Sequence, residues 1–161
     1  MISKQLLTDI QLYIDNNLIF EDSSLVCGSI LSDGMDDLRE RIENIDEGFS
    51  QFMLRKIDEL GITDADCYKK AQLNRSHFNK IKNDPAYNIR KSTAIAIGLA
   101  LELDRDTFDE LIEKAGYALS NSSIFDLVIC YCIEHQIYDV LKVNEILSDF
   151  EQDLLGAGLK D

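Results

Sequence analysis

Apolar residues recur every three or four positions along most of this 161-residue chain, and only one proline interrupts the pattern. That spacing puts apolar side chains on one face of an α-helix, whereas a half-buried strand would need strict alternation. Hydrophobic residues make up 45% of the sequence and aromatic residues 8%, a composition typical of a folded helical protein. We therefore expect an all-α fold with a core large enough to be stable without disulfides or metal.

The N-terminal part, residues 1–47, is expected to form a helical extension and a linker. The first helix is predicted over residues 4–18, with Ser3 as its N-cap. Small and polar residues dominate from Glu21 to Gly34, which is the best candidate for a linker. Asp33 can then cap a second helix, whose apolar positions are Met35, Leu38, Ile42 and Ile45.

Residues 48–118 are expected to hold five helices. The first runs from Phe49 to Leu60 and stops at Gly61, a typical C′ glycine. The next is opened by Thr63 to Asp66, which have the form of a capping box, and Asn74 can cap the third. The third has to end before Pro85, because the residue that precedes a proline avoids the helical region.

The fourth helix of this group, residues 91–103, is apolar nearly all round and should therefore lie in the middle of the bundle. The fifth ends at Gly116. Residues 119–161 are expected to form a C-terminal helical extension with two helices, 122–135 and 138–150.

The charge is distributed unevenly along the chain. The formal net charge is −14, which argues against non-specific binding to nucleic acid or to an anionic membrane. Residues 65–92, however, carry seven basic and two acidic residues, a local charge of +5 within a remainder of −19. This segregation predicts one basic surface on an otherwise acidic protein, provided that the basic residues face the same way; a solvated helix face is the alternative.

Other features narrow the class of protein. The N-terminus shows no apolar core of a secretory signal, and the longest uncharged apolar run, residues 94–101, is far shorter than the ~20 residues that span a bilayer. Nucleotide-binding, hydrolase and metalloprotease motifs are absent, and the four cysteines lack CxxC spacing. We expect a cytoplasmic protein with reduced thiols, no catalytic residues, no cofactor, no metal and no membrane partner.

Residues 62–83, ITDADCYKKAQLNRSHFNKIKN, resemble the repressor-type helix-turn-helix of the Cro/C1 (XRE) family. The matching positions are Ile62-Thr63 at the start of helix two, Leu73-Asn74 before helix three, and the run from Phe78 to Asn83 that closes the recognition helix. The likeness extends over about residues 49–117. It implies a λ-repressor-like five-helix core with added N- and C-terminal helices, in a DNA-binding transcriptional regulator of bacterial or phage type that acts as a homodimer.

The resemblance also implies which residues meet DNA. The N-terminal part of the recognition helix faces base edges in the major groove, and other groups lie along the phosphates. Leu73, Phe78 and Ile81 are expected in the core. The base-contact candidates are Arg75, Ser76, Asn79, His77 and Lys80, and the phosphate-contact candidates are Lys82, Asn83, Tyr87, Arg90 and Lys91.

A second hypothesis belongs to a different class. Asp64 stands where many members of the family carry a glutamine that braces the DNA backbone, and a carboxylate there would repel phosphate. Tyr68 replaces a small alanine, and Gln72 replaces the glycine of the turn. The chain could thus be a helical protein–protein interaction module that has kept a repressor-like fold, with the acidic helical extensions as its docking surface.

Overall fold

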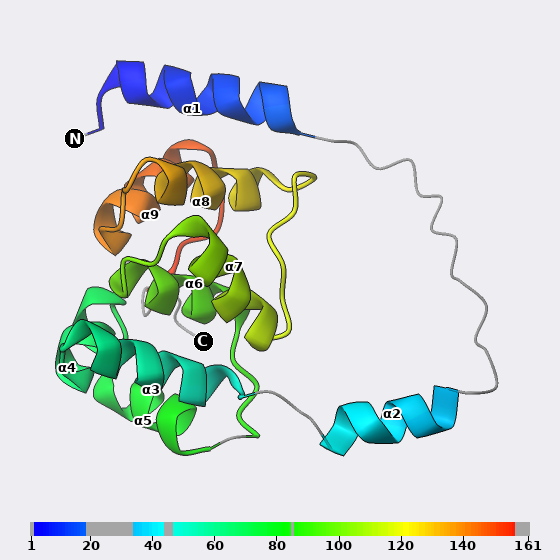
Figure 1. Ribbon diagram of the computed structural model, residues 1–161. Helices are drawn as coiled ribbons and strands as arrows, with labels where there is room; N and C mark the ends of the chain where they lie inside the picture. Colours follow the sequence, from blue (N-terminus) through cyan, green and yellow to red (C-terminus); the bar gives the residue numbers. More distant parts are fainter. Residues whose placement is uncertain (1, 19–33, 44–46, 85, 157–161) are drawn as a thin grey trace.

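A computed structural model describes residues 2–18, 34–43, 47–84 and 86–156. Within these ranges the chain forms nine α-helices and no strand, which confirms the all-α prediction (Figure 1). Of the expected linker, Glu21 to Gly34, only Gly34 is described. The predicted cap Asp33 and the predicted apolar position Ile45 also lie outside the described residues. The helices are α1 (Lys4–Asn17), α2 (Gly34–Glu43), α3 (Phe49–Leu60), α4 (Asp64–Lys70), α5 (Arg75–Asn83), α6 (Lys91–Ala100), α7 (Arg105–Lys114), α8 (Ile124–Glu134) and α9 (Val140–Asp149).

The predicted helix starts are confirmed where the sequence supplies a capping side chain. Ser3 Oγ accepts a hydrogen bond from the Leu6 N–H, and Asn74 Oδ1 accepts one from the His77 N–H at 2.7 Å. At the start of α4 the capping box is complete, because Thr63 and Asp66 each accept from the other's backbone N–H. These bonds satisfy donors that the first turn of a helix leaves without partners.

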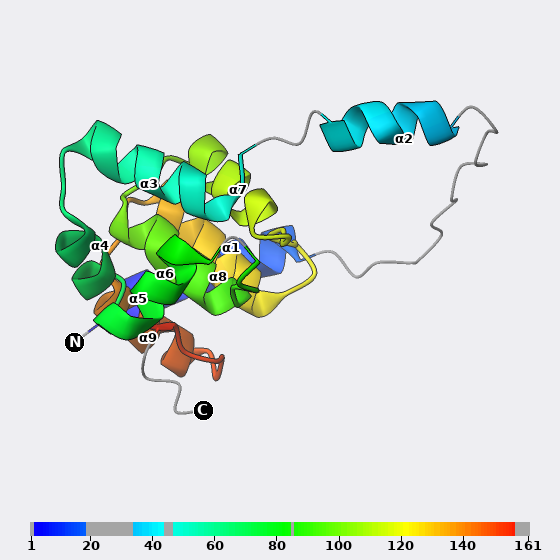
Figure 2. The ribbon, with the colours of Figure 1, turned by 90° about the horizontal axis from the view of Figure 1, so that it is seen from below.

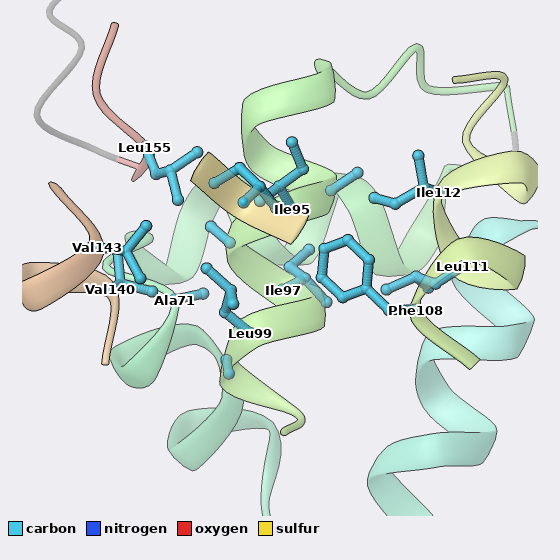
Figure 3. Close-up of a cluster of buried hydrophobic side chains, with 14 of the residues drawn as sticks. Ala71, Ile95, Ile97, Leu99, Phe108, Leu111, Ile112, Val140, Val143 and Leu155 are labelled. Carbon is cyan, nitrogen blue, oxygen red and sulfur yellow. The ribbon is translucent and has the colours of Figure 1, made fainter. Parts of the chain in front are cut away.

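Helix α6 lies in the middle of the bundle, as its apolar sequence predicts. Every residue from Thr93 to Leu101 is buried, and α4, α7 and α9 all pack against this helix. Figure 3 shows side chains of α7, α9 and the C-terminal segment converging on Ile95, Ile97 and Leu99. At Gly98, an added Cβ would lie 2.5 Å from the ring of the fully buried Phe108, so a glycine lets α7 approach closely.

The remaining helices stack in layers on this centre. From one end of the molecule to the other lie α1, then α8, then α6 and α7, then α3 (Figure 1). The packed pairs follow this order: α1 with α8, α8 with α7, and α7 with α3. Seen from below, α9 and α3 also lie at opposite sides of the bundle (Figure 2). The apolar residues of α2 belong to no part of the core cluster.

The C-terminal segment returns to the middle of the bundle. Leu155 is buried, and its backbone is held by Asn144, which accepts from the Leu155 N–H and donates to the Leu155 carbonyl. The next residue, Gly156, lies against the connection between α4 and α5, since an added Cβ would be 3.0 Å from the carbonyl oxygen of Ala71. The last described residues therefore support the turn that precedes α5.

Six of the described helices end in the same way, with one residue in the left-handed conformation and a backbone bond that closes the last turn. Glycine takes this position after α3 and α7, at Gly61 and Gly116, as predicted. After α4, α6, α8 and α9, however, residues with side chains have φ between 52° and 59°; they are Gln72, Glu102, Gln136 and Glu151. The helix predicted over residues 91–103 accordingly stops at Ala100, because Glu102 turns the chain and Leu103 N–H bonds back to the Gly98 carbonyl.

These positions provide a test of local backbone strain. Glu102→Gly and Glu151→Gly are each expected to raise the free energy of unfolding by about 0.5–1 kcal/mol, because the left-handed region is costly for residues with a Cβ. The matched control is Glu110→Gly inside α7, which should lower stability by about 1 kcal/mol. Urea denaturation measures all three, and a loss of stability at residues 102 and 151 would contradict the assignment of strain.

Candidate nucleic-acid interface

The connection between α4 and α5 positions the predicted site. Lys70 ends α4, Arg75 begins α5, and residues 71–74 form the turn between them. Leu73, Phe78 and Ile81 are buried, as predicted, and they fix α5 to the core. The ring of Tyr68, which takes the place of a small residue in the family pattern, packs on the Phe78 ring with 5.6 Å between centroids. The larger side chain is thus accommodated as an additional core contact.

The outer face of α5 carries four of the five predicted base-contact residues. Arg75, Ser76, Asn79 and Lys80 are all exposed. Together with Asn83 and Asp84 they line a shallow, open hollow of about 710 Å³. The free N–H groups at the start of a helix carry a partial positive charge, and Asn74 engages only one of them. The beginning of α5 is therefore polar, cationic and accessible.

His77, the fifth base-contact candidate, faces a different neighbour. Its Nε2 lies 3.1 Å from the Tyr87 hydroxyl, and the two rings meet edge to face with 6.0 Å between centroids. This contact brings together one residue from each of the two predicted sets. It also holds the connection after α5 against the helix, so Tyr87 sits beside the candidate surface with its hydroxyl engaged.

Lys82 forms an ion pair with Asp64, the residue that departs from the family pattern. The Lys82 Nζ lies 2.7 Å from Asp64 Oδ2, and each side chain is a little over one third exposed, at 36% and 38%. The carboxylate at the start of α4 thus neutralises a lysine at the end of α5. An exposed pair of this kind contributes little to stability, but it lowers the positive potential beside α5.

Lys91 takes part in a more deeply buried cluster. Its Nζ donates to Asp126 Oδ2 at 2.8 Å, and that carboxylate, which is 2% exposed, also accepts the Ser120 N–H. The Oδ1 atom of Asp126 has no hydrogen-bond partner among the described residues. The lysine at the start of α6 therefore compensates a carboxylate of α8, and the pair joins the two helices. Of the other phosphate-contact candidates, Asn83 and Arg90 are exposed, the latter as the N-cap residue of α6.

Sequence reasoning did not single out Asp126, which joins α8 to α6 through its ion pair with Lys91. A signal was present, because it is the only charged residue in the apolar stretch from Ile124 to Ile133. A charge in a helix that is apolar on all sides has to be buried and paired. Tyr117 was likewise missed as a support, and its hydroxyl donates to the Ile89 carbonyl at 2.9 Å next to Arg90.

The buried thiols offer no nucleophile near this surface. Burial raises the pKa of Cys67 to about 12, that of Cys130 to about 11 and that of Cys132 to about 12, so all three stay protonated at neutral pH. Among the described residues no group of three or more histidine, cysteine or acidic side chains could hold a metal ion. In the same ranges every helix is too short or too polar to cross a lipid bilayer.

No protein-family model, curated protein or solved structure matches this chain.

Proposed function

We propose that this protein binds double-stranded DNA with α5 as its recognition helix, as a transcriptional regulator of the Cro/C1 type. The observation that carries the proposal is the division of α5 into two faces. Phe78 and Ile81 anchor one face in the core, while Arg75, Ser76, Asn79 and Lys80 share the other face and remain exposed. A major groove about 12 Å wide admits such a helix, and these side chains can donate to base edges.

The phosphate contacts in this proposal come from the residues around the end of α5. Asn83 and Arg90 are exposed on either side of the connection between α5 and α6, and Tyr87 lies between them in sequence. Lys82 and Lys91 already have carboxylate partners. In this proposal Lys91 holds α6 and α8 together. Lys82 contacts a DNA phosphate once Asp64 is displaced or neutralised.

The direct test is a titration of the full chain with mixed-sequence duplex DNA at low and moderate salt. Neutralising phosphates with basic side chains releases counterions, so the affinity is expected to fall steeply as salt rises, with a slope of about −0.9 per phosphate contact on a double-logarithmic plot. Absence of binding even at about 50 mM salt would reject DNA binding. It would favour the interaction-module hypothesis, to which Asp64 and the −19 charge outside residues 65–92 already point.

The ion pair between Asp64 and Lys82 allows a gain-of-binding prediction. Asp64→Asn keeps the size of the side chain but releases Lys82, so the affinity for duplex DNA at low salt should rise about 3- to 10-fold, and the salt slope should steepen by about one. Asp58→Asn, at an exposed acid of α3, changes the net charge equally and serves as the control. Equal gains from both variants would mean that only the net charge matters.

A further inference from the structure

Helix α2 carries an apolar stripe that the other described residues leave uncovered. Met35, Leu38 and Ile42 are 62%, 47% and 56% exposed. At 100° per residue these three side chains share one face, and Arg39 and Arg41 border it on its two sides. Of the four acids of α2, Asp36 and Glu40 lie on the opposite face, and Asp37 pairs with Arg41 at 2.9 Å. The helix thus presents an apolar strip about 10 Å long with Arg39 at its margin, since Arg41 is paired with Asp37.

A groove of matching character runs between α1 and the end of α9. It has a volume of about 440 Å³ and is lined by Leu7, Thr8, Gln11, Leu12, Asp15, Asp149 and Phe150. Leu12 is 59% exposed there, and the described residues of the lining include two carboxylates and no basic side chain. Within the described part of the chain neither Asp15 nor Asp149 forms an ion pair. The groove therefore suits an apolar helix face with an arginine at its edge.

The length of the connection between α2 and α3 decides whether α2 of the same chain or α2 of another copy can enter this groove. Only residues 44–48 separate Glu43, the end of α2, from Phe49, the start of α3, and six peptide steps span at most about 20 Å. The groove lies beyond α7 and α8 as seen from α3, with α1 and α3 at opposite ends of the stack (Figure 1). Three helix-to-helix distances of 8–10 Å amount to about 24–30 Å. The connection between α2 and α3 is therefore too short for Ile42 to reach the groove of its own chain.

We propose that α2 docks into the α1–α9 groove of a second copy of this chain. Met35, Leu38 and Ile42 would lie on Leu7, Leu12 and Phe150 of the partner copy, and Arg39 would pair with Asp15 or Asp149. Since each copy carries both this helix and this groove, two reciprocal contacts close a two-fold symmetric dimer. The proposal stands independently of DNA binding.

The first test measures the mass of the full chain by light scattering across the micromolar range. The wild type should reach twice 18.3 kDa, while Ile42→Ser in α2 and Leu12→Ser in the groove should each weaken self-association about tenfold or more. The control is Leu60→Ser in α3: Leu60 is 50% exposed, close to the 56% of Ile42 and the 59% of Leu12, and its loss should leave self-association unchanged. A wild-type mass of 18.3 kDa throughout, or a dimer that neither variant weakens, would overturn the proposal.

Charge reversal tests the orientation of the contact. Arg39→Glu and Asp149→Arg should each weaken the dimer, and the chain that carries both should regain most of the affinity. The assigned pairing is wrong if neither Arg39→Glu with Asp149→Arg nor Arg39→Glu with Asp15→Arg restores self-association.

Disulfide trapping separates the second copy from the same chain. In a background with Cys27 replaced by serine, a mixture of Leu38→Cys and Leu12→Cys chains should cross-link on mild oxidation, since Cys67, Cys130 and Cys132 are buried. Each variant alone should not. If a chain with both substitutions cross-links only internally and stays at 18.3 kDa, α2 occupies its own groove and the proposal is wrong.

Discussion

Lys91→Ala is expected to lower the free energy of unfolding by about 2–4 kcal/mol, because it leaves the Asp126 carboxylate buried without its cation. Asp126 is 2% exposed, and its Oδ1 already lacks a hydrogen-bond partner among the described residues. Lys91 itself is 30% exposed, so water can enter the space it vacates, which keeps the loss below that of a fully buried pair. Urea denaturation at neutral pH measures the effect.

Two further variants separate this cause from a general loss of charge. Lys80→Ala removes an exposed lysine of α5 and should change stability by no more than about 0.5 kcal/mol. Adding Asp126→Asn to Lys91→Ala should recover a large part of the loss, since the orphaned charge disappears. A loss below about 1 kcal/mol for Lys91→Ala alone would show that the carboxylate does not depend on this lysine.

Arg75→Ala is expected to weaken binding to the preferred duplex by about 1–3 kcal/mol, or roughly 5- to 150-fold, with a much smaller effect on scrambled DNA. The guanidinium can donate two hydrogen bonds to a guanine edge, a geometry that lysine cannot reproduce, so Arg75→Lys should recover little of the loss. The preferred duplex is first selected from a random library, and fluorescence anisotropy then gives the two affinities.

Lys142→Ala, at an exposed position of α9, is the matched control for this measurement and should leave both affinities unchanged. Arg75→Ala should also unfold at the same urea concentration as the wild type, because Arg75 is exposed at the start of α5. An equal loss on preferred and scrambled DNA would make Arg75 a phosphate contact without a role in reading sequence.

The helices and their caps could be predicted because their signals are local. Ser3, Thr63, Asn74 and Gly61 act within three or four residues, through bonds to nearby backbone groups. Glu102 was not expected to end a helix, since a side chain disfavours the left-handed backbone that this residue adopts. Helix α6 was placed correctly in the centre because its sequence offers no polar face to water.

The surroundings of the candidate site depended on contacts that sequence spacing does not encode. Asp64 and Lys82 are 18 residues apart, and Lys91 and Asp126 are 35 apart. The basic run in the sequence therefore showed which residues carry positive charge, but it did not show which of them form ion pairs with carboxylates. The exposed face of α5 was predictable, because Phe78 and Ile81 fix its rotation by helical period alone.

The packing of Gly156 beside Ala71 limits how far this protein can be shortened. A fragment that stops at residue 118 would contain every residue of the candidate surface, yet it would lack Val140, Val143 and Leu155, which cover one side of α6 (Figure 3). It would also remove the support of the turn before α5. Binding measured on such a fragment would describe an α5 whose supporting contacts are missing. Residues 119–156 therefore belong in every comparison of variants.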